Sequence, residues 1–413
     1  MRIDIDRDRL VETMEDQAEI GGTEGGGLHR LALSDTDREV RDWFVDRAAD
    51  AGLDVRVDAF GNTFARREGA DPDAEPLLVG SHLDSQPYGG IYDGALGVVA
   101  ALEFVRTLND RAIETRRPVE VVNWTNEEGS RFPPAMQGSG VWAGAHDIEA
   151  EYEKTDADGT RLLDELERIG YHGDEPAEPR EPYHAYLELH PEQGPFLEET
   201  GADVGIVTGI VGLRWADITL HGQANHTGTT PMNYREDALV AASDIVTAIR
   251  RLPGTLGDRT VATVGSLTVQ PNSVNTVPET VTLTTDIRDP DEAVLDEGVA
   301  RMEAEVAAAA DREGIEYEIE HTMASPTVDF PDRPVEAVAD AVDHLGYDGR
   351  RMVSGAGHDA THAAAVCGAA MVFSVSEGGK SHTEDEFTSW PDCYRSSNVL
   401  ANAALDLAEP IVD

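Results

Sequence analysis

The pattern of apolar and polar positions predicts that the outer parts of the chain form an α/β domain. Apolar residues recur at helical spacing in 36–51 and 96–108, which is typical of helices that bury one face. Short continuous apolar runs at 76–85 and 119–128 are typical of buried strands that break into polar loops. Strands and helices that alternate in this way indicate a mainly parallel sheet flanked by helices, with functional groups at the carboxyl ends of the strands.

The middle of the chain has a different pattern. The segments 214–222, 259–269 and 280–288 alternate polar and apolar residues with a period of two, as half-buried strands do. Two segments with helical spacing, 235–252 and 291–314, follow the first and the third of these strands. This combination predicts a two-layer α+β unit, with helices on one face of its sheet.

The order of the two patterns predicts a discontinuous domain. The α/β pattern returns from about Ser325, with a helix expected at 334–345. We therefore expect one α/β domain formed by residues 1–210 and 324–413, interrupted by an inserted α+β domain at residues 211–323.

The charge of the chain is strongly acidic. It has 413 residues with 32 Lys and Arg against 80 Asp and Glu, which gives a net charge of −48. Nucleic acid is excluded as a partner, because binding to phosphates requires an excess of basic residues. Lys154 and Lys380 are the only lysines. An acidic, lysine-poor surface is suited to a cytoplasm of molar salt, where charge repulsion is screened, so we expect a halophilic source; an acidic protein from a mesophile is the alternative.

Several absences indicate a cytoplasmic protein. No run of about 18 apolar residues exists to cross a membrane, and the N-terminal segment MRIDIDRDRL has no apolar signal region. Cys367 and Cys393 are too few for a disulfide framework. We expect a reducing, cytoplasmic location and no membrane association.

Histidine and acidic residues gather near the ends of the predicted strands. They are His82 with Asp84, Asp93, Glu127 with Glu128, His190 with Glu192, and His382. A single histidine in such a place is more often structural, but imidazole and carboxylate together are the donor set for Zn²⁺, Mn²⁺, Co²⁺ or Ni²⁺. In the segment HLD, the strand period places the first and third residues on one side. We expect Asp84 to accept the second ring N–H of His82 and to fix its tautomer.

Six segments resemble those of a known family of amidohydrolases. They are GSHLDSQPYGGIYDGALGV (80–98), NEEGSRF (126–132), ELHPEQGPFLE (188–198), ANHTGTTPM (224–232), SGAGHDA (354–360) and GGKSHTEDE (378–386). They resemble the hydantoinase/carbamoylase-type amidases, a branch of the aminoacylase/carboxypeptidase-like metallopeptidases. That branch includes N-carbamoyl-L-amino-acid hydrolases, allantoate amidohydrolases and β-ureidopropionases.

The resemblance implies a catalytic domain that binds two divalent metal ions per subunit. His82 and His190 resemble the terminal ligands of one ion, and Glu128 and His382 those of the other, with Asp93 as the bridging carboxylate. Zn²⁺ is favoured, and Mn²⁺, Co²⁺ or Ni²⁺ are alternatives.

The resemblance also assigns a catalytic base and several contacts to the substrate. Glu127 resembles the general base that deprotonates a water bridging the metals. Gln193 resembles a residue that contacts the ureido group, and His358 resembles another residue that faces the substrate. His226 resembles a histidine that stabilises the oxyanion and is donated by the small domain, often across a dimer interface. The inserted domain is therefore expected to act as a dimerisation and lid domain.

A carboxylate-binding pair is implied as well. Asn275 and Arg288 resemble the residues that hold the substrate carboxylate, and Arg214 is a weaker candidate for the same anionic pocket. Arginine is suited to this role because its planar guanidinium binds a carboxylate with two hydrogen bonds.

The resemblance leads to a hydrolase that acts on linear amides. We expect it to cleave the N-carbamoyl C–N bond of N-carbamoyl-L-amino acids, with a small ureido acid as its substrate and a homodimer as its working form. The alternatives are an allantoate amidohydrolase, a hydrolase of N-acyl amino acids or dipeptides, and a non-catalytic dimer that binds metal as a scaffold.

Overall fold

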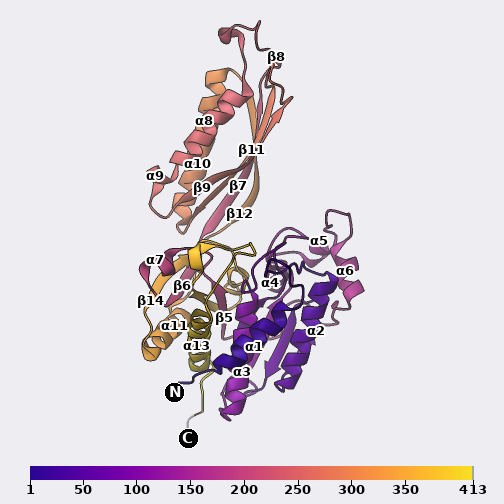
Figure 1. Ribbon diagram of the computed structural model, residues 1–413, viewed down its shortest axis with the longest axis vertical. Coiled ribbons are helices and arrows are strands. Elements are labelled where there is room, and N and C mark those ends of the chain that lie inside the picture. Colours follow the sequence, from indigo (N-terminus) through magenta and orange to yellow (C-terminus); the bar gives the residue numbers. More distant parts are fainter. Residues whose placement is uncertain (412–413) are drawn as a thin grey trace. The chain divides into compact units, whose positions relative to one another are not determined.

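The computed structural model describes residues 1–411, which form two compact units (Figure 1). Unit 1 consists of Met1–Thr208 together with the chain from Phe330 onward, and unit 2 is Gly209–Asp329. Unit 2 extends beyond the predicted insertion at both ends and includes the short strand β13 (Val328–Asp329), which pairs with Ile210 and Gly209. No helix among the described residues is both long enough and apolar enough to span a membrane.

The sheet of unit 1 is parallel in its centre. Its four central strands lie in the order β4 (Val119–Trp124), β3 (Leu77–His82), β5 (Ala185–Pro191) and β15 (Gly368–Ser374). All pairs among them are parallel. Their residues are almost entirely buried, because both faces of a parallel sheet are covered. The predicted parallel sheet is confirmed for these strands.

The edges of this sheet are antiparallel. On one side β2 (Thr63–Arg67) pairs with β4, and β1 (Asp54–Val57) pairs with β2. On the other side β6 (Val204–Ile210) runs antiparallel to β15 and also pairs with β14 (Gly349–Ser354). The fold of unit 1 is therefore mixed α/β, and the sequence pattern did not predict these edge strands.

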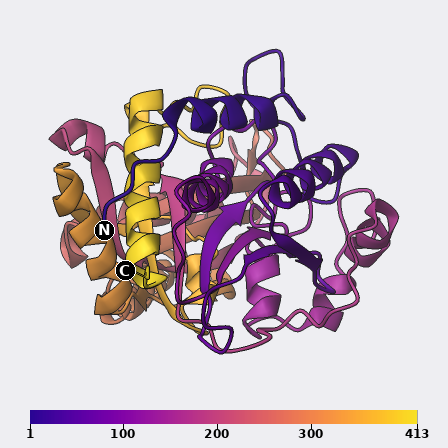
Figure 2. The ribbon, with the colours of Figure 1, turned by 90° about the horizontal axis from the view of Figure 1, so that it is seen from below.

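Long helices cover the sheet of unit 1. They are α1 (Arg7–Ala18), α2 (Asp35–Asp50), α3 (Ala95–Asp110), α11 (Asp332–Leu345) and α13 (Trp390–Leu407). Helix α3 lies beside α13 against the central strands, and α1 contacts both (Figure 2). Helix α3 is buried along most of its length because its sequence is apolar on nearly every side.

Short helices complete unit 1. They are α4 (Gln137–Trp142), α5 (Ile148–Tyr152), α6 (Leu162–Ile169), α7 (Phe196–Thr200), α12 (Ala360–Ala363) and the 3₁₀ turn η2 (Glu377–Gly379). Helices α5 and α6 belong to an acidic segment, yet Tyr152, Leu162 and Leu166 pack with Phe60 and Phe132 in a small core of their own.

Unit 2 is a two-layer α+β structure. Its antiparallel sheet has the order β12 (Glu316–Ser325), β7 (Gly212–His221), β11 (Thr280–Asp289) and β9 (Val261–Gln270). The helices are α8 (Ala238–Arg251), α9 (Pro253–Leu256) and α10 (Glu292–Glu313), with the 3₁₀ turn η1 (Met232–Tyr234). A separate two-stranded ladder joins β8 (Asn225–His226) to β10 (Thr276–Val277).

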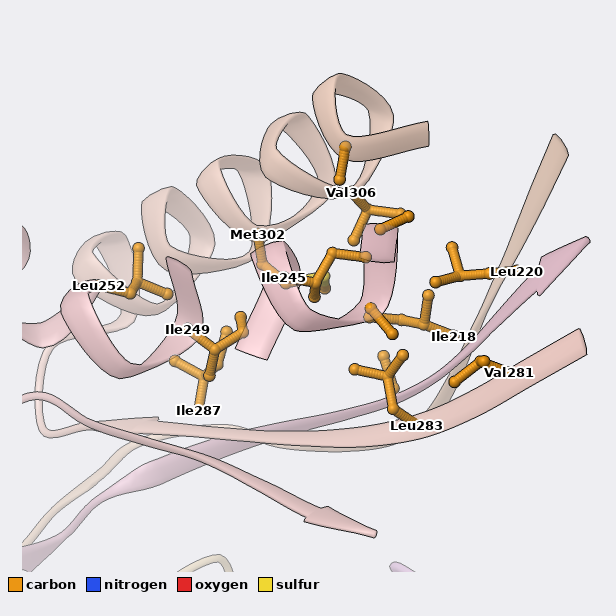
Figure 3. Packing of buried hydrophobic residues seen from close by; sticks show 14 of the residues in the cluster. Ile218, Leu220, Ile245, Ile249, Leu252, Val281, Leu283, Ile287, Met302 and Val306 are labelled. Atoms are coloured by element: carbon orange, nitrogen blue, oxygen red, sulfur yellow. The ribbon is translucent and has the colours of Figure 1, made fainter. Parts of the chain in front are cut away.

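The core of unit 2 lies between its helices and one face of its sheet (Figure 3). Ile218 and Leu283 point from the strands toward Ile245 of α8 and Met302 of α10. Burial alternates along β11, so that every second residue faces the helices and the others face away. A role of this unit in dimerisation stays a prediction.

Candidate metal centre

The histidine and acidic residues that the sequence singled out meet at one edge of the sheet of unit 1. His82 is the last residue of β3, His190 is the penultimate residue of β5, and Glu127 and Glu128 follow the end of β4. Because these strands are parallel neighbours, their carboxyl ends lie together. Asp93 lies in the turn before α3, and His382 lies in the loop between β15 and α13.

The side chains form two groups that share Asp93. The first is His82, Asp93 and His190, and the second is Asp93, Glu128 and His382; within each group the ligand atoms lie within 4.8 Å of one another. The Oδ1 atom of Asp93 is 2.8 Å from His190 Nε2 and 3.7 Å from His82 Nε2, whereas Oδ2 is 3.4 Å from His382 Nε2. The two oxygens of one carboxylate thus face different groups, as a bridging ligand requires.

The hydrogen bonds of His82 leave one nitrogen free to bind a metal. The ring is buried, and burial lowers the pKa of His82 to about 4, so the imidazole is neutral. Its Nδ1 lies 3.0 Å from the main-chain oxygen of Asp84, so Nδ1 carries the proton. Nε2 is buried without a hydrogen-bond partner among the described residues. A buried polar atom without a partner is costly, and a metal ion at Nε2 removes that cost.

The acidic residues of the centre crowd one another. Burial, together with the negative charges of Asp359, Glu128 and Asp93, raises the pKa of Glu127 well above its usual range. The pKa of Glu128 is raised in the same way, by burial and by Asp93 and Asp84. Carboxylates packed this closely need positive charge beside them to ionise, and divalent ions supply it. The donor set of histidine and carboxylate without cysteine fits such ions.

Asp84 has a different contact from the one that we predicted. The Nδ1 atom of His82 is 3.0 Å from the main-chain oxygen of Asp84 and 3.7 Å from its carboxylate. The carboxylate instead accepts the backbone N–H groups of Glu127 at 3.2 Å and Glu128 at 3.3 Å. The reason is that β3 ends at His82, so the alternation of a strand no longer applies at Asp84. Asp84 therefore holds the turn that carries Glu127 and Glu128.

The two predicted substrate contacts in unit 1 both lie at the centre. Gln193 has a positive φ of 58°, and its Nε2 donates to Asp93 Oδ2 at 3.1 Å and to Ser381 Oγ at 2.9 Å. His358 is buried, with its ring centroid 4.4 Å from that of His190 and its Nε2 2.9 Å from Ser354 Oγ. In this structure His358 supports the ring of His190, and its Nε2 is already hydrogen-bonded.

The predicted residues of unit 2 do not come together within one chain. His226 lies in β8 and Asn275 directly precedes the paired strand β10, and both are exposed; Thr280, the first residue of β11, follows Asn275 by five residues. Arg288 lies at the other end of β11, eight residues on, which corresponds to about 26 Å at about 3.3 Å per residue. The expected pair of Asn275 and Arg288 is thus separated by nearly the length of a strand.

Arg214 and Arg288 lie on opposite faces of the sheet of unit 2. Arg214 is on the helix side, where its guanidinium bonds to Glu292 of α10 and, at 2.8 Å, to the main-chain oxygen of Ser325. Arg288 is on the face away from the helices and bonds to Asp286 at 2.8 Å. The period of two along paired strands places them on opposite sides, so they do not share one pocket within this unit.

Two supporting residues were missed in the sequence. Glu386 accepts the backbone N–H of Asp93 at 3.1 Å and the hydroxyl of Ser381 at 2.7 Å, and burial with the charge of Asp93 raises the pKa of Glu386 to about 8. Gln86 donates to Glu128. Both lie close in the sequence to a predicted ligand, His82 or His382, but the sequence gives no signal for the hydrogen bonds that they make.

Comparison with known proteins gives the family. Residues 78–406 match the peptidase family M20/M25/M40. The chain is 44% identical to the N-carbamoyl-L-amino-acid amidohydrolase of Rhizobium meliloti, over 98% of this chain and 97% of that protein. It is 35% identical to the allantoate amidohydrolase of Escherichia coli, over 97% and 98% of the two chains. The crystal structure of an amidase of the hydantoinase/carbamoylase family from Burkholderia multivorans superposes with a TM-score of 0.94 at 45% identity, covering 99% of this chain and all of that one.

The chain belongs to the peptidase family M20/M25/M40, and within it to the hydantoinase/carbamoylase-type amidases. It is a metal-dependent amidohydrolase that acts on C–N bonds of amides other than peptides.

Proposed function

We propose that the protein hydrolyses the ureido C–N bond of N-carbamoyl-L-amino acids and releases the amino acid, CO₂ and ammonia. The observation that carries this proposal is the shared carboxylate of Asp93 between two ligand groups, with Glu127 beside them. The names of the relatives support the substrate class, since N-carbamoyl-L-amino-acid amidohydrolases match over nearly the whole chain.

The residues of unit 1 divide the chemistry among them. His82, His190 and Asp93 would hold one divalent ion, and Asp93, Glu128 and His382 a second. When bound, the two ions supply Lewis acidity for the substrate carbonyl and for the attacking water. Glu127 Oε2 lies 3.5 Å from His82 Nε2. From there Glu127 takes the proton of the attacking water and delivers it to the leaving nitrogen.

We propose two Zn²⁺ ions per subunit, with Mn²⁺, Co²⁺ or Ni²⁺ as other ions that the same donors accept. Metal analysis of the purified protein tests the number, and reconstitution of the metal-free protein with each ion tests the preference.

We further propose that Gln193 and His358 of unit 1, and His226, Asn275 and Arg288 of unit 2, contact the substrate. Gln193 is suited to the ureido group because its amide already lies 3.1 Å from Asp93. Arg288 is suited to the substrate carboxylate because of its planar guanidinium.

We also propose a homodimer formed through unit 2, which the separation of these residues supports. One small substrate cannot span about 26 Å between the ends of β11. If His226 and Asn275 serve the site of a second subunit, each site receives both ends of unit 2, one from each copy. Molecular mass in solution tests this arrangement.

The substrate class is tested by a panel of compounds. The metal-loaded protein is incubated at high salt with N-carbamoyl-L-amino acids, allantoate, N-acetyl amino acids and dipeptides, and ammonia or free amine is measured. Ammonia release that is fastest from the carbamoyl amino acids supports the proposal. Cleavage of acylated amino acids or dipeptides without ammonia release from any carbamoyl compound rejects it.

Allantoate is the second candidate substrate. It offers both a ureido group and a carboxylate, and two relatives that match over more than nine-tenths of this chain are named allantoate amidohydrolases. A value of kcat/KM that is higher for allantoate than for every carbamoyl amino acid selects this alternative.

A further inference from the structure

Gln86 makes an unusual set of hydrogen bonds to a single residue, Glu128. Its backbone N–H donates to Glu128 Oε1 at 3.0 Å, and its side-chain amide donates to Glu128 Oε2 at 2.8 Å. The same amide donates to the main-chain oxygen of Glu128 at 3.3 Å. Both oxygens of the carboxylate and the backbone that carries it are therefore held by one residue.

This contact concerns the less buried of the two ligand groups. In the first group the side chains of His82 and His190 are 1% and 2% exposed, and main-chain oxygens fix their rings. In the second group the side chain of His382 is 51% exposed and lies in a loop. A loop ligand that is half exposed loses conformational freedom on binding an ion, which weakens the site. Because His382 is loosely held, the affinity of the second group for an ion depends strongly on how Glu128 is placed.

Gln86 orients the carboxylate without blocking it. Gln86 donates one hydrogen bond to each oxygen of the Glu128 side chain. A carboxylate has about four acceptor positions, so two remain free when Gln86 is bound. Glu128 Oε2 also lies 3.7 Å from Nε2 of His382, another ligand of its group.

We infer that Gln86 is a positioning residue that holds Glu128 as a ligand and sets how tightly the second metal ion binds. The inference rests on the proposed two-ion centre. Partners that hydrogen-bond to metal ligands change metal affinity by about 10- to 100-fold when they are removed. We expect an effect of this size at the second site alone.

The experiment titrates metal-free protein with Zn²⁺ in competition with a chromophoric chelator, which yields a dissociation constant for each of the two ions. Three variants are compared with the wild type: Gln86→Leu, Gln86→Glu and, as a matched control, Gln223→Leu, an exposed glutamine of unit 2. Gln86→Leu removes the amide and keeps the backbone N–H. Gln86→Glu keeps the length of the side chain but exchanges the donor for a second negative charge.

The expected result is that both Gln86 variants weaken the second ion about 10- to 100-fold and change the first less than about twofold. Gln86→Glu should have the larger effect, while Gln223→Leu should match the wild type. Equal weakening of both ions, or none, in Gln86 variants whose metal-free thermal unfolding equals that of the wild type overturns the inference and leaves the proposed function intact.

The same titration distinguishes a failure of the proposed function from a failure of the role of Gln86. A wild-type protein that binds one ion per chain overturns both the two-ion centre and the role of Gln86. A wild-type protein that binds two ions, with the second weakened in Gln86→Leu, supports the inference even when no ureido compound is cleaved.

Discussion

The two units hold their predicted functional residues in very different ways. In unit 1 the ligands are mostly buried, and each is held by at least one neighbour: His82 by a main-chain oxygen, Asp93 by His190, and Glu128 by Gln86. In unit 2 His226 and Asn275 are exposed at one end of the sheet, and Arg288 lies at the other end. Unit 1 brings its predicted ligands together, whereas unit 2 keeps its predicted substrate contacts apart.

This difference shows what fixes the position of the side chains in each unit. Side chains at the carboxyl ends of adjacent parallel strands are placed by the hydrogen bonds of the sheet itself. Residues on exposed loops and short ladders gain fixed positions only from what they dock against. Variants in the two units should therefore fail in different ways.

The largest effect is expected for Glu127→Gln in unit 1. Glutamine has the same shape but cannot accept the proton of the attacking water, so kcat should fall by about 100- to 10,000-fold. Metal content should stay at the wild-type value, because Glu127 belongs to neither ligand group. Steady-state kinetics and metal analysis of one preparation measure both quantities. Retained turnover in this variant would remove Glu127 as the base.

The next largest effect is expected for His226→Ala in unit 2. Loss of a donor that stabilises the oxyanion lowers kcat by about 100- to 1,000-fold. The residue is exposed and far along the chain from every ligand, so the metal content and the thermal unfolding of the protein should not change. A variant with wild-type kcat would confine the active site to unit 1.

Mixing the two inactive variants tests whether the subunits share their residues. In a heterodimer of Glu127→Gln and His226→Ala, one of the two sites would combine an intact Glu127 with the intact His226 of the other subunit. Random exchange at equal concentrations should then restore about a quarter of wild-type activity, the fraction expected for a twofold dimer. If no activity returns although exchange is demonstrated by labelled subunits, His226 acts within its own chain.

For unit 1, the sequence predicted where the ligands lie but not the hydrogen bonds that hold them. Buried strand segments ending in His82 and Glu127 were visible as apolar runs that stop at polar residues, so the place of the ligands could be inferred. The carboxylate of Asp84 was given the wrong partner, since the exact end of β3 cannot be read from an apolar run. Gln86 and Glu386 were missed because they act through hydrogen bonds to other residues, and a single sequence contains no signal for such contacts.

For unit 2, the sequence predicted the strands and helices well but not which functional residues lie together. Its period-two strands and amphipathic helices were predicted nearly residue by residue, because the alternation on β11 and β7 is regular. The faces of Arg214 and Arg288 could have been read from that alternation, which places them on opposite sides. The proximity of Asn275 to His226 could not, because it depends on the β8–β10 ladder, whose strands are two residues long.

A smaller effect is expected at the two arginines. Arg288→Gln should raise KM for a carboxylate-bearing substrate about 10- to 100-fold, equivalent to about 1.5–3 kcal/mol for hydrogen bonds to a charged group. Arg214→Gln breaks the pair with Glu292 on the helix side of the sheet. It should lower the free energy of unfolding by about 1 kcal/mol or less and change KM less than about twofold. Steady-state kinetics and chemical denaturation of both variants test whether the two faces of the sheet have different roles. An increase in KM for Arg214→Gln equal to that for Arg288→Gln would contradict this distinction.

The smallest effect is expected from salt, which should change KM but hardly change kcat. We propose that the net charge of −48 reflects adaptation to molar salt. At low ionic strength the negative field repels an anionic substrate, whereas at 1 M salt the Debye length is about 3 Å and exposed charges are screened.

The ligands of unit 1 are mostly buried and little affected by screening, so metal content and kcat should be nearly constant. Because the substrate must reach the site through the solvent, KM should fall a few-fold between about 0.2 M and about 3 M KCl. Michaelis–Menten curves across this range measure both constants, with an uncharged carbamoyl amino amide as the control substrate whose KM should not change. An equal fall of KM for the charged and the uncharged substrate would place the effect of salt on the protein's structure and not on the approach of the anion.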